Sequence, residues 1–390
     1  MVVARKSLEI ISIPEEIVSS QIGIDPKEER RPERTKGVAK HTVSIRTNGP
    51  AKSLSKLAKK IDREIRSINK VLRKQDAKLL PTGCHPFMRP EKEVELWQFQ
   101  SGDVGQLSHE LFDLRTHSWS NVQSAQISVP FANDEEFAKL HAAVRLLLPI
   151  IPALSASSPF LEGRYTGFLD SRMEAYLHAQ ETHPDLMGSM VPEPIYDQET
   201  YYREIYGPIG RVLGQHDPTR IHYHQHMNSR GAIPFFERDL LEIRVVDMQE
   251  APSADLAIAE FIVVALKALI NGRWVSSYVQ RAWPETDLLG IFLQVIKDAG
   301  NTTIANRDYL LMFGLLKQEQ MQALKLWQHM FVELYGDLSD NCRERIGHIL
   351  EHGCLASRIL QHTGRTPSHE KLVSVYSELA DCLAEDRMFN

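Results

Sequence analysis

The feature that most constrains the fold is a long apolar segment in the second half of the chain. From Leu256 to Ile270 the side chains are apolar nearly all round a helical wheel, which predicts a helix buried on every side. Ser253 is the expected N-cap, and Asp255 suits the positive N-terminal end of a helix. Because such a helix cannot face water, the rest of the chain must form layers around it.

The order of the other patterns predicts the fold class. Before Pro252, strand-like and helix-like segments are mixed, and after it the chain is almost wholly helical. Strand patterns lie at 41–47, 77–88, 122–131 and 240–247, and helical patterns at 53–75, 135–154, from about 169, 284–299, 317–335, 340–361 and 368–385. We therefore expect an α+β fold with an antiparallel sheet and a helical C-terminal part, not a doubly wound fold.

Composition excludes several classes of protein. A net charge of −6 argues against a dedicated nucleic-acid binder. The four cysteines have no metal-type spacing, and no apolar run reaches the ~18 residues of a membrane span, so we expect a cytoplasmic protein. The helix at 53–75 is rich in Lys and Arg but has no interleaved aromatic residue. A solvated outer face is therefore favoured there over contact with an acidic partner or nucleic acid.

The common catalytic fingerprints, such as GxxxxGK[ST], GxGxxG, HExxH and CxxC, are missing from this sequence. His222, His224 and His226 alternate, so on a strand they would share one face, as zinc ligands or as ordinary polar residues. Arg230, followed by Gly231, is suited to grip a phosphate or carboxylate, although it could equally be a surface arginine in a loop.

The segment 240–247, LLEIRVVD, combines a buried strand with two opposite charges. Glu242 and Arg244 share one face roughly 7 Å apart, since side chains alternate along a strand. They form either a structural ion pair or part of a site, and the chemistry of the residues leaves both open. Asp247 lies on the opposite face by the same alternation and is expected to cap a turn.

Several segments together resemble one family. They are LPTGCHPFM (80–88), the run from WSNVQSAQISV to TGFLDSRMEAY (119–176), HMNSRGAI (226–233) and the strand with the helix that follows it, LLEIRVVDMQEAPSADLAIAEF. In this order they resemble the type 2 glutamate–cysteine ligases, carboxylate–amine ligases related to glutamine synthetase. The resemblance covers roughly 41–389, a single expected ligase domain, and leaves 1–40 as a poorly ordered or divergent segment.

The resemblance implies an ATP-dependent ligation in which an acyl phosphate of glutamate is attacked by an amine. It implies a curved antiparallel sheet that holds ATP, Mg²⁺ or Mn²⁺ and the acid, with amino acid and amine as substrates and a homo-oligomer as the assembly. No nucleic acid or membrane partner is expected. By position, Glu242 resembles a metal ligand, and Arg244 and Arg230 resemble catalytic anion-binding residues. Residues of substrate or nucleotide binding would be Gln126, Ser128, Asn228 and Arg172.

The sequence departs from the family where further metal ligands should lie. Relatives begin with a G-[IV]-E-L-E strand, whereas here the nearest segment, SLEIIS at 7–12, holds only Glu9. Ser44 stands where relatives carry another carboxylate, and Gln126 and Ser128 replace a His-x-His pair. Asp170, Glu174 and Glu193 are conceivable substitute acids. Two hypotheses remain: an active ligase, or an impaired paralogue that binds a metabolite, nucleotide or protein without turnover.

Overall fold

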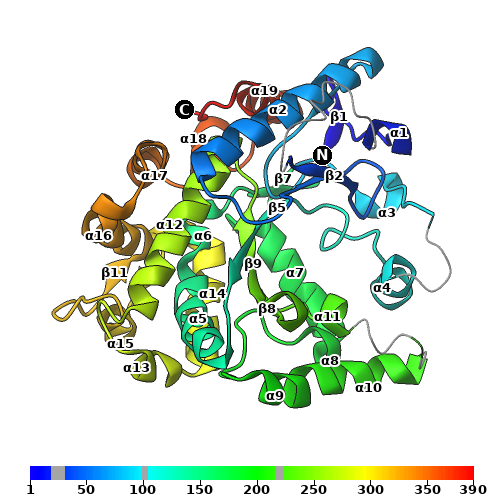
Figure 1. The fold of residues 1–390 in the computed structure, drawn as a ribbon. Coiled ribbons are helices and arrows are strands. Elements are labelled where there is room, and N and C mark those ends of the chain that lie inside the picture. The colour runs from blue at the N-terminus through cyan, green and yellow to red at the C-terminus, as the bar shows by residue number, and fades with distance from the viewer. Residues whose placement is uncertain (19–30, 99–103, 217–218, 220–223) are drawn as a thin grey trace.

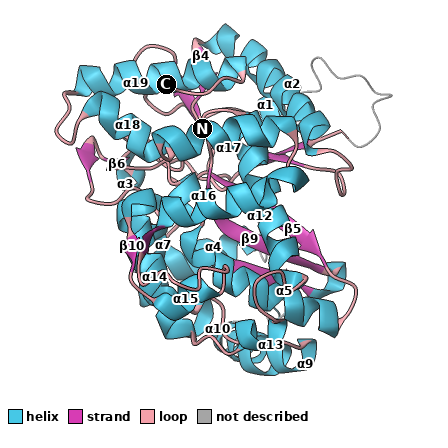
Figure 2. Cartoon of the chain, turned by 90° about the vertical axis from the view of Figure 1, so that its left-hand side faces the viewer, coloured by secondary structure: helices cyan, strands magenta, loops and turns pink. Residues whose placement is uncertain are grey.

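The computed structural model describes residues 1–18, 31–98, 104–216, 219 and 224–390 (Figure 1). The apolar segment forms α12 (Pro252–Ile270), which packs against α2 (Leu54–Leu72), α5 (Asp134–Leu147), α16 (Ala323–Leu334) and α17 (Asp340–His352). Figure 2 shows α16 and α17 lying across α12. The predicted buried helix is therefore confirmed. Its N-cap is Ala251 rather than Ser253, because Pro252 already occupies the first helical turn.

The largest sheet has three antiparallel strands in the order β5 (Ser124–Pro130), β9 (Leu240–Asp247) and β8 (Ala232–Phe235). Its core face packs against α5, α12 and the short α6 (Pro152–Ser155). Figure 1 shows these helices to the left of the sheet and α7 (Ser171–Thr182) to its right. The core face is apolar, as the alternation of β9 predicts.

The pairing of β5 with β9 contains a β-bulge. Ala125 faces Val246 and Ile127 faces Ile243, so that Arg244 and Val245 both lie opposite Gln126. One extra residue on β9 shifts its alternation of faces by one position from there on. Val245 and Val246 consequently both reach the core.

The other strands form two-stranded antiparallel ladders: β1 (Val2–Ala4) with β4 (Ala77–Leu79), β2 (Glu33–Lys36) with β3 (Val43–Arg46), β6 (Phe160–Leu161) with β7 (Arg164–Tyr165), and β10 (Thr303–Ile304) with β11 (Met321–Gln322). The α+β class is confirmed, with the strands spread over several small ladders. In the segment 1–40, β1 is buried against β4 and β2 pairs with β3. Residues 19–30 lie outside the described part.

The C-terminal part is helical, as predicted. Beyond α12 it holds α13 (Ser277–Arg281), α14 (Glu285–Asp298), α15 (Arg307–Leu311), α16, α17, α18 (Leu355–Thr363) and α19 (His369–Glu385). The segment expected as one helix from 340 to 361 is two helices, because Gly353 has a positive φ of 90°. The helix expected at 317–335 begins only at Ala323, since the two residues before it pair with β10.

The remaining short helices lie in the first two thirds of the chain. They are α1 (Glu15–Val18), α3 (Pro90–Glu93), α4 (Val104–Phe112), α8 (Pro184–Met187), α9 (Gln198–Tyr201), α10 (Gly207–His216) and α11 (His224–Met227). Helical turns of other types occupy Arg73–Gln75, Leu148–Ile150, Tyr202–Tyr206, Phe236–Arg238, Ala299–Asn301 and Tyr335–Asp337. Within the described ranges, no helix has the length and apolar character needed to cross a bilayer.

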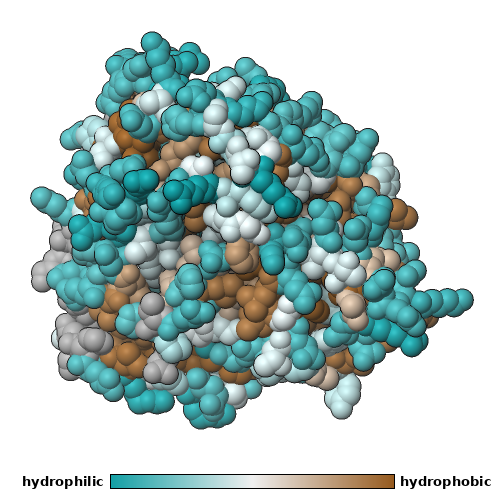
Figure 3. Space-filling view, turned by 180° about the vertical axis from the view of Figure 1, so that it is seen from behind, coloured by the Kyte–Doolittle hydropathy of each residue, from teal (hydrophilic) through white to brown (hydrophobic). Residues whose placement is uncertain are grey.

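Large apolar side chains that face water lie mostly on the helical part. The most exposed are Tyr278 on α13, Leu316 after α15 and Val332 on α16, with Leu293 on α14 less so. Figure 3 shows the back of the molecule, where apolar atoms gather in the lower half between polar rims. These side chains are on different elements from the charged face of β9.

Candidate active site

Glu242 and Arg244 meet on the face of β9 that is turned away from the core. Arg244 Nε donates to Glu242 Oε1 at 2.8 Å. The Arg244 side chain is 28% exposed and the Glu242 side chain is 16% exposed. Ser128 on β5 lies directly opposite Glu242. The same-face placement predicted from the sequence is therefore present, and water still reaches part of both side chains.

Asp247 is not a turn cap on the opposite face, as the alternation had predicted. The bulge reverses the phase of β9, so Asp247 lies opposite Ser124, on the side of the sheet that carries Gln126 and Ser128. Its carboxylate is fully buried and accepts hydrogen bonds from the Ser157 backbone N–H at 2.9 Å and the Ser158 hydroxyl at 2.8 Å. Asp247 is therefore the centre of a buried polar cluster.

Arg172 connects this buried cluster to the Glu242–Arg244 pair. Its guanidinium forms an ion pair with Asp247, and its Nη1 donates to the backbone carbonyl of Arg244 at 3.3 Å. Its Nη2 is buried and has no hydrogen-bond partner among the described residues. Arg172 was expected to bind substrate or nucleotide, and that nitrogen is a donor still open to an anion.

Asp170 caps the helix that carries Arg172. Its side chain accepts from the Met173 backbone N–H at 2.9 Å and is fully buried. Burial, followed by the negative charge of Asp247, raises the pKa of Asp170 well above its ordinary value. The Asp170 carboxyl group is therefore closed to solvent and already used as a helix cap.

Arg230 is not a surface loop arginine. Its Nε and Nη2 both donate to the Glu193 carboxylate at 2.5 Å, and its Nη1 donates to Asn228 Oδ1 at 3.1 Å. Asn228 is fully buried and donates to the Tyr201 hydroxyl at 3.0 Å. The structure brings Arg230, Asn228 and Glu193 into one group, in which all three nitrogens of the Arg230 guanidinium are already hydrogen-bonded.

Glycine backbones lie directly against both buried charged groups. A Cβ at Gly83 would overlap the Asp247 carboxylate, and one at Gly188 would overlap the Arg230 guanidinium. Gly188 also has φ 68° and ψ −163°, a conformation that only glycine adopts readily. Glycine is therefore needed at both positions for the backbone to approach the charge.

The other predicted residues fall in different places. Gln126 and Ser128 are exposed on β5, as a pair near a ligand would be. His224 and His226 lie on the helical turn α11 rather than on a strand, so they do not share a face in the way the zinc reading required. His222 lies outside the described residues.

The fit of divalent metal ions depends on the carboxylates near Glu242. The described ranges contain no group of three or more His, Cys, Asp or Glu side chains that could hold a metal ion. Ser44 lies on β3 opposite Thr35, and Glu9 is an exposed residue bonded to Ser7. Mg²⁺ can bind through one carboxylate if phosphate oxygens and waters complete its shell. The side chains therefore fit one such ion at Glu242 and do not fit a second.

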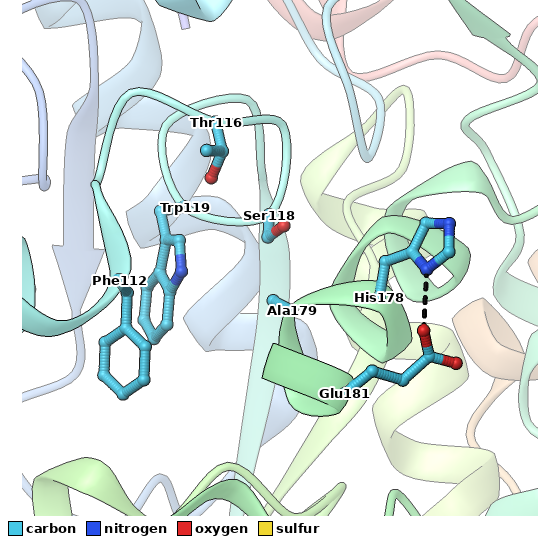
Figure 4. Close-up of a pocket in the computed structure, with 7 residues that line it drawn as sticks. All are labelled: Phe112, Thr116, Ser118, Trp119, His178, Ala179 and Glu181. Carbon is cyan, nitrogen blue, oxygen red and sulfur yellow. Dashed lines mark hydrogen bonds and ion pairs between the residues drawn. The ribbon is translucent and has the colours of Figure 1, made fainter. Parts of the chain in front are cut away.

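A pocket of about 440 Å³ opens at the far end of α7 from Arg172. It is lined by Phe112, Thr116, Ser118, Trp119, His178, Ala179 and Glu181 (Figure 4). The Phe112 and Trp119 rings stack with centroids 5.0 Å apart and planes inclined by 21°. Sequence reasoning missed this pocket, although the two aromatic residues that flank the end of α4 were a visible signal.

Comparison with known proteins agrees with the motifs. The family model described as glutamate–cysteine ligase family 2 matches residues 12–378. The chain is also similar to an uncharacterized protein of Archaeoglobus fulgidus, with 27% identity over 355 residues, which cover 91% of this chain and 88% of that protein. The suspected family is thereby confirmed. The chain belongs to glutamate–cysteine ligase family 2, and that membership supports a function of the carboxylate–amine ligase kind.

Proposed function

We propose that the protein joins the carboxyl group of an acidic substrate, glutamate in the first instance, to an amine at the expense of ATP. The observation that carries the proposal is the arrangement of two arginines at one strand. Arg244 is partly exposed, and buried Arg172, bound to the Arg244 carbonyl, keeps Nη2 without a partner in the described part of the chain. Such an arrangement suits a substrate that carries carboxylate and phosphoryl oxygens.

The proposed reaction has two balanced steps. First, a substrate carboxylate oxygen forms a bond to the γ-phosphorus of ATP, and the bond from that phosphorus to ADP breaks, with ADP leaving with the electron pair. Second, the amine nitrogen forms a bond to the acyl carbon, and the carbon–oxygen bond to phosphate breaks. Phosphate leaves with the electron pair, and the amine gives up a proton to solvent.

The side chains on β9 supply binding and charge neutralisation rather than covalent chemistry. Arg244 would leave Glu242 to contact the phosphoryl group as negative charge develops on it, while Arg172 holds the strand beneath it. Glu242 is the residue that would hold one Mg²⁺, which when bound supplies positive charge to the phosphate oxygens. The exposed hydroxyl of Ser128 lies opposite Glu242 and could hydrogen-bond the same phosphates.

The second candidate function is binding without turnover. It is favoured by the metal ligands, because the part of the chain seen in the structure holds no group of three or more potential ligands, whereas the family chemistry usually uses several carboxylates. A protein of this kind would bind an anionic metabolite or nucleotide at Arg172 and Arg244 and would release it unchanged.

One experiment separates the two candidates. The purified protein is incubated with ATP, Mg²⁺ or Mn²⁺, glutamate and a panel of amines, while ADP and phosphate release are followed and nucleotide binding is measured by calorimetry. Turnover that requires all components supports the ligase, and binding without turnover supports the second candidate. A Glu242→Gln variant with unchanged turnover would refute the assignment of the site, and Glu204→Gln, which breaks an exposed Arg–Glu pair of the same 2.8 Å length outside the site, serves as a matched control.

A further inference from the structure

We propose, building on the ligase function above, that the pocket at the end of α7 holds the side chain of the acceptor amine, and that this amine carries an aromatic ring. The amine nitrogen would lie toward β9 and the ring between the Phe112–Trp119 pair and α7. The assignment concerns which amine is used, which neither the family match nor the charged residues on β9 determine.

The aromatic wall of the pocket is the first support. Phe112 ends α4, and Trp119 follows it across a short loop, so their rings stack on one side of the cavity. Figure 4 shows these rings on one side of the space and His178 and Glu181 on the other. The Tyr176 ring on α7 also packs against Trp119, with the ring centroids 6.2 Å apart. A flat apolar group is the ligand that such a wall stabilises most.

The polar side chains of the pocket favour a neutral ring over a second ammonium group. The one carboxylate in the lining, Glu181, is hydrogen-bonded to His178 Nδ1 at 3.0 Å. That bond raises the pKa of His178. A distal cation would have to compete with His178. Thr116 Oγ1, in contrast, is buried without a partner among the described residues and can hydrogen-bond a ring substituent.

The position of the pocket connects it to the charged residues on β9. Arg172 near the start of α7 contacts Asp247 and the Arg244 carbonyl, and His178 lies six positions later, roughly 9 Å along the helix. The Ser118 hydroxyl donates to the Ala175 carbonyl at 3.0 Å and fixes the Trp119 loop onto α7. One helix thus carries both Arg172 and part of the pocket lining.

The test compares an acceptor that needs no pocket with acceptors that do. Hydroxylamine traps an acyl phosphate as a hydroxamate whatever the pocket contains, so it reports the proposed function alone. Phenethylamine, tyramine, ethylamine and putrescine are compared as acceptors, and binding of phenethylamine is measured directly by calorimetry. We expect wild type to prefer phenethylamine over ethylamine by about tenfold or more in kcat/KM.

Two variants examine the pocket itself. Trp119→Ala removes the stacking wall, and Ala179→Trp fills the space from α7 and keeps the proposal testable if the first variant fails to fold. Both should abolish the preference and the phenethylamine binding, while hydroxamate formation stays within about twofold of wild type. Tyr278→Ala, 85% exposed on α13, is the control and should change neither.

The outcomes distinguish the two proposals. If no hydroxamate forms with wild type, the ligase function fails, whereas phenethylamine binding that Ala179→Trp abolishes would still uphold the pocket. If hydroxamate forms but ethylamine or putrescine is used as well as phenethylamine, or phenethylamine binds Ala179→Trp as tightly as wild type, the pocket assignment is overturned.

Discussion

Strand β9 carries two sets of charged groups that differ in their access to water. Glu242 just before the bulge and Arg244 within it form one hydrogen bond and remain partly exposed. After it, Asp247 is fully buried and is bound by Arg172, two serines and a backbone N–H. The hydrogen bond between Glu242 and Arg244 can be replaced by a bond to a ligand at little cost in free energy. Breaking the Asp247–Arg172 ion pair would leave a buried charge without a partner.

This difference shows that a charged residue in a family motif is not by itself a binding residue. Arg172, Arg230 and Asn228 resemble site residues, yet each makes hydrogen bonds inside the protein that a structural residue would make. A ligand needs an unmet hydrogen-bonding atom or exposed surface to bind, and Arg172 has the first and Arg244 the second.

The largest effect on stability should come from the buried side of the comparison. Asp247→Ala leaves the Arg172 guanidinium buried and uncompensated, so the free energy of unfolding should fall by about 3–5 kcal/mol. Urea denaturation followed by circular dichroism measures this. The double variant Arg172→Leu, Asp247→Leu should recover much of the loss, and a single variant as stable as wild type would contradict the buried cluster.

A smaller loss is expected where a glycine backbone lies against a charge. Gly188→Ala forces a side chain into a glycine-only conformation and against the Arg230 guanidinium, which should cost about 1–3 kcal/mol. Thermal unfolding gives the value. Gly163→Ala is the control, because its φ is also positive but a Cβ there would meet no atom. Equal losses in the two variants would refute the role of Arg230.

Buried histidines predict a loss of stability in acid. Burial lowers the pKa of His41 to about 4 and the pKa values of His85 and His141 to about 3, from 6.5. Below pH 6.5 the unfolded chain takes up protons that the folded protein refuses. Each histidine therefore removes about 1.4 kcal/mol of stability per pH unit from 6.5 down toward its folded pKa, and above 6.5 there is no such loss.

The measurement is the free energy of unfolding between pH 7 and pH 5. His41→Gln should reduce the slope of the free energy of unfolding against pH by the contribution of one proton, ~1.4 kcal/mol per pH unit. A variant with the slope of wild type would show that His41 can be protonated in the folded state.

The smallest effect on stability, and the sharpest contrast, belongs to the exposed pair. Glu242→Gln should change the free energy of unfolding by less than about 1 kcal/mol, because the pair is partly hydrated and makes one hydrogen bond. If the ligase function is correct, the same variant should lose roughly 100-fold or more in kcat, since the group acts on developing phosphoryl charge. If stability and turnover both fell in this variant, Glu242 would be as important to the fold as the buried charges, and the distinction between the two sets would be refuted.

The sequence was sufficient for features that depend on local periodicity. The apolar pattern of α12 and the shared face of Glu242 and Arg244 follow from spacing alone, and both are present in the structure. The motif order also led to the right family.

Features that depend on contacts between distant segments could not be predicted. The bulge that turns Asp247 to the other face is created by the pairing of β5 with β9, more than a hundred residues apart. The neutralisation of Arg230 by Glu193 depends in the same way on how the loop before α9 packs. The alternation of three histidines is typical of a strand, but the structure places His224 and His226 in the helical turn α11 instead.

The bulge divides β9 into two parts that can vary independently. Substitutions at Glu242, Arg244 and the facing Ser128 alter a surface that water already reaches, so the chemistry there can drift without loss of the fold. A deletion of one residue between Ile243 and Val246 would restore regular pairing and carry Asp247 to the wrong side of the sheet. The exposed part of β9 can therefore change in sequence without loss of the fold, whereas the buried part that follows the bulge cannot.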